Sequence, residues 1–168
     1  MALGRTNINL PEIPIKPKAV YLYKEGDECT DISGGWKIMN RNATYNTTTK
    51  NADSIVLKST TGYASAGAAV VTTNLIDVTN HNTLRILFDC DANSLERSSL
   101  DFRFVSNGSS WSNAWNSLVV GGSITPVDTN LHTGIEMSVD LSTTNGEYYL
   151  FLTTYTNTTV TIREVWLE

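Results

Sequence analysis

The chain has 168 residues, enough for one domain with a substantial core, and Asp, Glu, Lys and Arg make up only 17% of it. Thr, Asn and Ser are abundant instead, and because they suit exposed strand faces and turns, the composition predicts an all-β fold. The net charge of −5 leaves no basic stripe for phosphate groups, so we expect no nucleic-acid binding. No apolar run reaches the roughly 18 residues of a membrane-spanning helix, so no membrane partner is expected either.

Residues 1–18 are predicted to form an extended N-terminal arm, and residues 19–168 the folded domain. Three prolines in the arm recur at every third residue, which is the period of a polyproline II helix. Apolar side chains between the prolines would be exposed to water in an isolated arm, so we expect the arm to lie against another subunit. The predicted assembly residues are Leu10, Pro11, Ile13, Pro14, Ile15 and Pro17. The first ten residues lack the hydrophobic centre of a signal peptide, so synthesis in the cytoplasm is expected.

From Ala19 onward, apolar and polar residues alternate with the period of two that predicts β-strands. The clearest segments are "TLRILFDCD", "LDFRFVS" and "GIEMSVDL". About nine such strands, separated by Gly-, Asn- and Ser-rich connections such as "VGGS" and "STTNGE", predict an antiparallel, jelly-roll-like β-sandwich. The segment "YYLFL" is apolar on both faces, which predicts a central strand. The apolar parity changes between Ile162 and Val165, which predicts a β-bulge, and no helix longer than two turns is expected.

An acidic segment follows the first predicted strand, in "YLYKEGDECTDISGGWKI". Its carboxylates are candidate oxygen ligands for a structural Ca²⁺, the only cofactor that we consider. Their spacing does not match an EF-hand loop, so a solvated loop at the end of the sheet is the favoured alternative. The candidate calcium ligands are Glu25, Asp27, Glu28 and Asp31.

Two tryptophans, Trp111 and Trp115, lie in the polar segment "SNGSSWSNAWNS", which is predicted to be exposed. Exposed aromatic rings stack on the faces of sugars, so these two are candidate ligand-binding residues. The alternative is that both rings pack over an open end of the sandwich. Trp36 and Trp166 fall within strand-like segments and are predicted to lie in the core.

A catalytic role is not expected. The segment "GYASAG" has Tyr63 where a nucleophile elbow requires glycine. The two histidines, His81 and His132, lie in turn-like segments, and with Cys29 and Cys90 they form no zinc-binding spacing. Two cysteines do not indicate a disulfide scaffold, so we expect both thiols to be reduced.

Four segments, "LYKEGDECTDISGGW", "KNADSIVLKS", "VVTTNLIDVTNHNTLRI" and the terminal "VWLE", resemble a β-sandwich module of tail and other virion proteins from phages that infect Gram-positive bacteria. The resemblance covers most of residues 21–168, and the module is similar in outline to carbohydrate-binding modules. It implies that the first strand pairs near the C-terminal "VWLE" and that Gly34 and Gly35 turn the chain sharply into the second strand.

The resemblance implies a non-enzymatic structural or adhesion protein of a virion: a capsid decoration protein, a collar or fibre subunit, or a baseplate appendage. The arm would anchor it, the sandwich would be exposed, and its partners would be other virion proteins and copies of itself. The alternative is a carbohydrate-binding module that recognises bacterial cell-surface glycans. A glycan-active enzyme that uses Glu25 and Asp27 lacks an evident acid/base pair.

Overall fold

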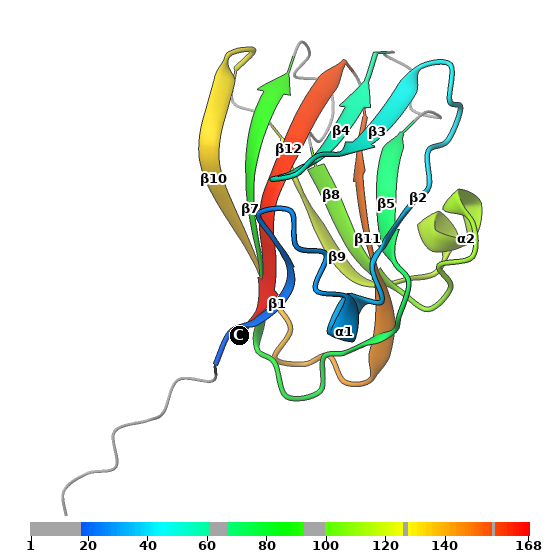
Figure 1. Cartoon of the computed structure of the whole chain (residues 1–168). Coiled ribbons are helices and arrows are strands. Elements are labelled where there is room, and N and C mark those ends of the chain that lie inside the picture. The colour runs from blue at the N-terminus through cyan, green and yellow to red at the C-terminus, as the bar shows by residue number, and fades with distance from the viewer. Residues whose placement is uncertain (1–17, 61–66, 93–99, 126–127, 156) are drawn as a thin grey trace, which may run out of the picture.

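The computed structural model describes residues 18–60, 67–92, 100–125, 128–155 and 157–168. Within these residues the chain forms two antiparallel β-sheets that pack face to face (Figure 1). The predicted all-β antiparallel sandwich is therefore confirmed, with twelve strands in the described part of the chain rather than about nine.

The first sheet is built around the C-terminal strand β12 and is called the β12 sheet below. One edge of β12 pairs with β7 along its length, and the other edge pairs first with β4 and then with β1. The register shifts between Ile162 and Glu164, which confirms the predicted bulge. The pairing of β1 with β12 also confirms that the first and last strands lie together. The strands are, in sheet order, β10 (Leu131–Asp140), β7 (Thr83–Ala92), β12 (Thr158–Leu167), β4 (Ile55–Ser59) and β3 (Asn46–Lys50), and β1 (Val20–Lys24) pairs with the later part of β12.

The second sheet, called the β11 sheet below, has the segment "YYLFL" at its centre, as predicted. One edge of its central strand β11 pairs with β8, and the other pairs with β5 and, at its start, with β6. In sheet order the strands are β2 (Trp36–Ile38), β5 (Ala68–Thr72), β11 (Glu147–Thr154), β8 (Leu100–Val105) and β9 (Leu118–Ile124), and β6 (Ile76–Asp77) pairs with the start of β11.

Strand β9 corrects one prediction, because its "VGGS" segment was expected to be a connection. Gly122 lies opposite Phe102 of β8, and a Cβ atom at Gly122 would come within 2.6 Å of that phenyl ring. The glycine is therefore present because the ring needs the space, not because the chain turns there.

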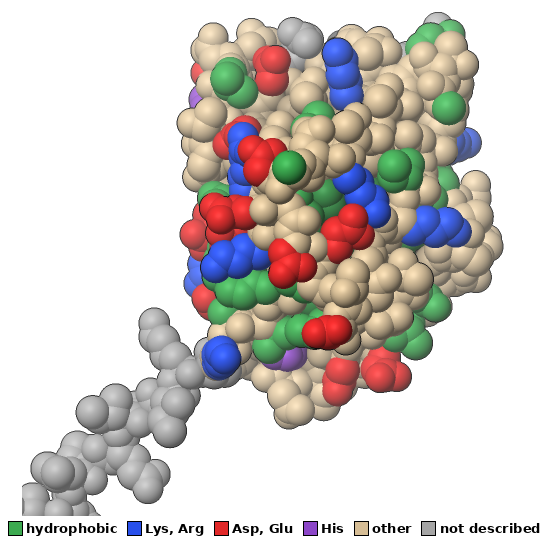
Figure 2. Space-filling model, in the orientation of Figure 1, with side chains coloured by type: hydrophobic (Ala, Val, Ile, Leu, Met, Phe, Trp, Pro, Cys, Tyr) green, Lys and Arg blue, Asp and Glu red, His purple; other side chains and the backbone are tan. Residues whose placement is uncertain are grey.

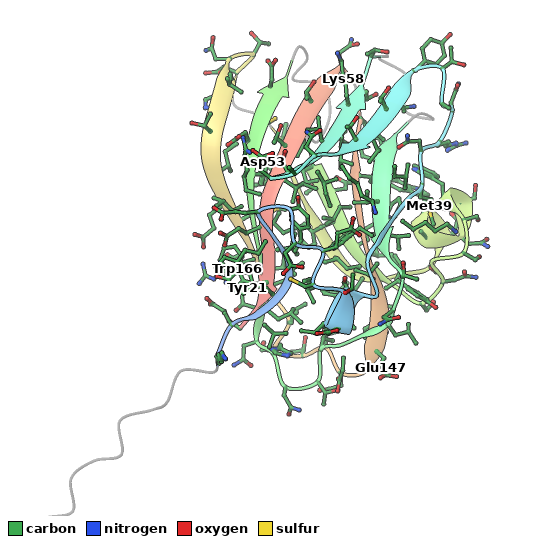
Figure 3. All side chains as sticks on the ribbon, in the orientation of Figure 1. Tyr21, Met39, Asp53, Lys58, Glu147 and Trp166 are labelled. Carbon is green, nitrogen blue, oxygen red and sulfur yellow. The ribbon has the colours of Figure 1, made fainter. Side chains whose placement is uncertain are left out.

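The main core lies between the two sheets and is formed by the inward-facing residues of both. Trp36 belongs to it, as predicted: its Nε1–H donates to the Leu22 carbonyl at 2.9 Å. Trp166 does not, because the bulge in β12 turns Val165 inward and leaves the indole half-buried on the outer face. There it contacts Tyr21 at a ring distance of 6.0 Å (Figure 3).

A second, smaller cluster lies on the outer face of the β11 sheet, beneath a short helix (Figure 1). The two helices in the described residues are α1 (Thr30–Ser33) and α2 (Trp111–Asn116), so the expectation of short helices is confirmed. Neither is long and apolar enough to cross a membrane. The second cluster contains Met39, Ala69, Val71, Val105, Trp111, Ala114, Phe151 and Tyr155.

The outer face of the β12 sheet carries charged residues in pairs, and Figure 2 shows basic and acidic side chains next to one another on the visible face. Arg163 contacts Asp89 at 3.0 Å and Asp53 at 3.3 Å, and Arg85 contacts Glu168 at 2.8 Å. Such exposed pairs each contribute only about 0–1 kcal/mol. Because the signs alternate, the visible face has no large area of one charge.

Candidate functional site

The acidic loop, residues 25–31, runs from the end of β1 into the first turn of α1, and one of its carboxylates holds it to the sandwich. Oε2 of Glu28 accepts the N–H of Trp36 at 2.8 Å, and Oε1 accepts from Nζ of Lys50 at 2.8 Å. Burial opposes ionisation of Glu28, but the hydrogen bonds from Lys50 and Trp36 outweigh it and hold its pKa below the ordinary value. Glu28 thus ties the loop to both β2 and β3.

The remainder of this segment is shaped by local backbone contacts. Oδ1 of Asp27 accepts the N–H of Cys29 at 2.8 Å. Gly34 and Gly35 have φ values of +69° and +89°, which confirms the predicted sharp turn into β2.

The structure gives no support to a calcium site in this loop. No three His, Cys, Asp or Glu side chains among the described residues gather closely enough to hold a metal ion. Glu28 and Asp27 already accept hydrogen bonds from the protein, so a metal would compete with those contacts. Calcium binding by the acidic loop stays a prediction.

The predicted assembly residues of the N-terminal arm, Leu10 to Pro17, lie outside the described residues. Their role in assembly therefore stays a prediction.

The predicted exposed segment with two tryptophans forms helix α2, which packs on the outer face of the β11 sheet. The Ser110 side chain accepts a backbone N–H of the first turn and caps the helix. Trp111 is only 7% exposed and contacts Phe151 edge-on at a ring distance of 6.2 Å, whereas Trp115 is half-buried. The prediction of exposure is wrong for Trp111, because one helical turn places Trp111, Ala114 and Trp115 on one face.

The two tryptophan rings stack on each other at 5.2 Å, and their planes differ by only 10°. A guanidinium group contacts each end of this stack: Cζ of Arg41 lies 4.7 Å from the Trp111 ring centre, and Cζ of Arg103 lies 3.5 Å from that of Trp115. Both rings therefore pack against the domain, as the alternative expected, but on the outer face of the β11 sheet rather than over an open end of the sandwich. Ligand contact by Trp115 stays a prediction.

Arg103 connects this stack to a nearly buried carboxylate on the same strand. Its guanidinium donates to the Trp115 carbonyl at 3.3 Å and to Oδ2 of Asp101 at 3.4 Å. Tyr155 also donates to that Oδ2, at 3.3 Å. Burial, with the Asp101 carboxylate adding to it, raises the pKa of Tyr155 above its ordinary value, so the hydroxyl keeps its proton. The other oxygen, Oδ1 of Asp101, is buried and has no hydrogen-bond partner among the described residues.

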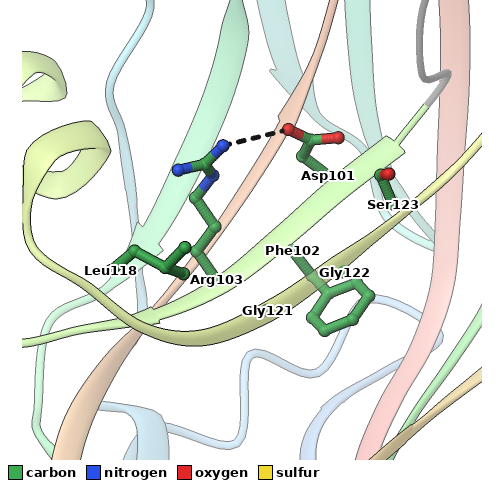
Figure 4. A pocket seen from close by; sticks show the side chains of 7 residues that line it. All are labelled: Asp101, Phe102, Arg103, Leu118, Gly121, Gly122 and Ser123. Atoms are coloured by element: carbon green, nitrogen blue, oxygen red, sulfur yellow. Dashed lines mark hydrogen bonds and ion pairs between the residues drawn. The ribbon is translucent and has the colours of Figure 1, made fainter.

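A hollow of about 180 Å³, called the Asp101 pocket below, lies over β8 and β9 (Figure 4). The strand register places Asp101 opposite Ser123 and Arg103 opposite Gly121. Figure 4 shows the Arg103 and Asp101 side chains on one face of the sheet and the Phe102 ring on the other. The pocket thus has an acceptor and a donor side by side on one face of the sheet. Its lining residues are Asp101, Phe102, Arg103, Leu118, Gly121, Gly122 and Ser123.

A second hollow of about 290 Å³, called the Tyr149 groove, lies over β2, β5 and β11. Tyr149 is half-buried at the edge of the outer cluster. A Cβ atom at Gly108 would come within 2.9 Å of Cγ of Tyr149, so the loop passes close to the ring. The lining includes one cation, Lys37, and no acidic side chain. It consists of Lys37, Val71, Thr72, Thr73, Ser106, Asn107, Gly108, Ser109 and Tyr149.

Sequence patterns indicate the residues of these two hollows only in part. Alternation in "LDFRFVS" does place Asp101 and Arg103 on one face, away from the main core. It does not reveal their partners, because Tyr155 lies 54 residues from Asp101 in the chain. Tyr149 was predicted only as part of a covered central strand.

No protein-family model matches the chain, and a search of curated proteins finds no match. Solved structures do match. The K2 cleaved adhesin domain of Lys-gingipain has a TM-score of 0.52 and 11% identity, over 90% of this chain and 99% of that one. The K3 cleaved adhesin domain of Lys-gingipain from Porphyromonas gingivalis W83 has a TM-score of 0.50 and 16% identity, over 79% of this chain and 90% of that one.

The enzymatically active domain of tailspike protein 4 from bacteriophage CBA120 also matches, with a TM-score of 0.52 and 13% identity. The match covers 88% of this chain but only 21% of the tailspike chain. Carbohydrate-binding modules match at TM-scores of 0.44 to 0.47, too low to carry an inference. At these identities the likeness is one of fold, and an origin in phages of Gram-positive bacteria stays a prediction.

Proposed function

We propose that this chain is a non-catalytic adhesion module that binds a carbohydrate in the Tyr149 groove. The observation that carries the proposal is the make-up of the groove: an aromatic ring, several uncharged hydrogen-bonding side chains and one cation.

Sugar rings present an apolar C–H face and a rim of hydroxyl groups. The half-buried ring of Tyr149 matches the apolar face, and side chains such as Thr73 and Asn107 match the hydroxyl groups. The volume of about 290 Å³ is close to the lower end of the roughly 300–1,000 Å³ range of small-ligand sites. The groove therefore suits a short stretch of a glycan rather than a long one.

Two further observations support a binding module rather than an enzyme. The adhesin domains share the sandwich fold over nearly their whole length. The groove has Lys37 as its single charged residue, so it offers no acid/base pair for glycoside hydrolysis. Placement on a phage particle, with other virion proteins and copies of itself as partners, is compatible with this proposal and remains a prediction.

A glycan array and a pull-down with bacterial cell walls test the proposal. Tyr149→Ala removes the ring and should weaken binding at least tenfold, which corresponds to about 1.4 kcal/mol. Tyr45→Ala is the matched control, because Tyr45 is 43% exposed and lies outside the groove. Its binding should equal that of the wild type.

Tyr149 also packs against the outer cluster, so Tyr149→Ala can lose binding because the domain is destabilised. A second variant therefore changes the groove while the Tyr149 ring is kept. Gly108→Ala adds a methyl group against the ring from the loop side and should also weaken binding. The proposal fails if no glycan binds, or if both groove variants bind as the wild type does.

A further inference from the structure

We infer that the Asp101 pocket is a second binding site and that its ligand is the vicinal diol of a neutral sugar or other polyol. It shares no lining residue with the Tyr149 groove, so the inference does not depend on the function proposed for that groove.

The two oxygens of the Asp101 carboxylate differ in their hydrogen bonding. The side chain is only 10% exposed, and its Oδ2 accepts hydrogen bonds from both Arg103 and Tyr155. Within the described part of the chain, Oδ1 has no hydrogen-bond partner. A buried acceptor without a donor is unfavourable and rare in folded proteins, so a ligand that supplies the donor gains that missing interaction.

The Asp101 carboxylate lies at the wall of the pocket. Asp101 lines the pocket directly. Figure 4 shows one carboxylate oxygen joined to Arg103 and the other on the side of Ser123, its partner on β9. Oδ1 is buried, so a ligand reaches it only when the carboxylate rotates about its terminal torsion, which has a broad energy minimum. This rotation gives up the contacts of Oδ2 with Arg103 and Tyr155, which the hydroxyl groups of the ligand must replace.

The Asp101 carboxylate is an acceptor, and the Arg103 guanidinium beside it is a donor. Nη2 of Arg103 lies 3.4 Å from Oδ2 of Asp101. One hydroxyl group of a diol can donate to the Asp101 carboxylate, while the oxygen of the neighbouring hydroxyl accepts from the Arg103 guanidinium. Two hydroxyls on adjacent carbons match this donor and acceptor side by side.

Charge and size narrow the ligand class further. A carboxylate or phosphate on the ligand would face Asp101, and an ammonium group would face Arg103, so the pocket disfavours both ions. The volume of about 180 Å³ is well below the roughly 300 Å³ of drug-sized sites, which leaves room for one small ring. Leu118 supplies an apolar wall for the ring's C–H groups.

Amide chemical shifts of the ¹⁵N-labelled full chain test this inference. Methyl α-mannopyranoside, which carries vicinal hydroxyls, should shift the amides of Gly121 and Gly122. Cyclohexanol, with one hydroxyl, should not. The amide of Gly108 reports separately on the Tyr149 groove, so failure at one site is distinguishable from failure at the other.

Two variants complete the test. Asp101→Asn should weaken the methyl mannoside effect at least tenfold. Ser123→Phe fills the pocket from an exposed position and should abolish the effect, whereas Ser138→Phe, on an exposed position of β10, should leave it unchanged. If Asp101→Asn fails to fold, Ser123→Phe still tests whether the sugar binds in the Asp101 pocket. The inference is refuted if methyl mannoside shifts neither glycine amide, if cyclohexanol acts equally, or if Ser123→Phe binds like the wild type.

Discussion

Trp111 is the residue whose removal most directly tests the packing of α2. Substitution by alanine deletes an indole that is only 7% exposed and that contacts both Phe151 and Trp115. If α2 is part of the folded core, Trp111→Ala should destabilise the domain strongly. If the helix merely displays the ring to solvent, the cost should be small.

The expected magnitude follows from this burial. Truncation of a buried tryptophan to alanine costs about 3–5 kcal/mol. Nε1 of Trp111 is buried without a hydrogen-bond partner in the described part of the chain, so its removal relieves part of that cost, and the expected loss is about 3 kcal/mol. For a chain of this length, that corresponds to a fall in melting temperature of roughly 6–12 °C. Trp115→Ala should cost less, roughly 1–2 kcal/mol, because Trp115 is half-buried.

Thermal and urea denaturation, both followed by far-UV circular dichroism, give the melting temperature and the free energy of unfolding of each variant, with the wild type as reference. A change in melting temperature below about 2 °C for Trp111→Ala would refute the packing of α2. Loss of glycan binding in a variant that keeps wild-type stability would instead support exposed, ligand-binding tryptophan rings.

Four further outcomes are expected. The pKa of Glu28 is lowered in the folded state, so its stabilising contribution is present above the unfolded pKa and is lost as pH falls through the folded pKa. Melting curves between about pH 3 and pH 7 should therefore show Glu28→Gln less stable than the wild type by about 0.5–1.5 kcal/mol near neutrality. This difference in stability should shrink in acid. A difference that does not depend on pH would contradict the role of Glu28. Gly26→Ala and Gly134→Ala form a matched pair, because both residues have positive φ. A Cβ atom at Gly26 would meet a backbone oxygen at 1.9 Å, whereas one at Gly134 has nothing within 4 Å. Gly134→Ala should cost about 1–2 kcal/mol in urea and Gly26→Ala clearly more, and equal costs would count against the close approach. Chelator followed by millimolar Ca²⁺ should leave the melting temperature unchanged, and a rise with Ca²⁺ would restore calcium binding by the acidic loop. Deletion of residues 2–18 should leave a folded sandwich that no longer assembles, as light scattering would show; a much lower melting temperature would place the arm in the core.

The sequence by itself determined the features that depend on local pattern. Alternation of apolar and polar residues predicted the sandwich, because each strand needs one face in a core. The parity change after Ile162 predicted the bulge in β12, and the two-sided apolar segment predicted that β11 is central. Gly34 and Gly35 predicted the turn into β2, because positive φ is unstrained in glycine.

Tertiary structure alone decided where the candidate sites lie. Gly122 lies in a strand and not in a turn, and it is glycine because the phenyl ring of the neighbouring strand occupies the space where a Cβ atom would lie. Trp111 is buried because α2 folds back onto a sheet face that already carries apolar residues. Among the described residues, one oxygen of Asp101 is unpaired because Arg103 and Tyr155 both donate to the other one. Contacts between residues far apart in the chain leave no local pattern, so burial, pairing and the shape of a pocket emerge only when the sheets pack.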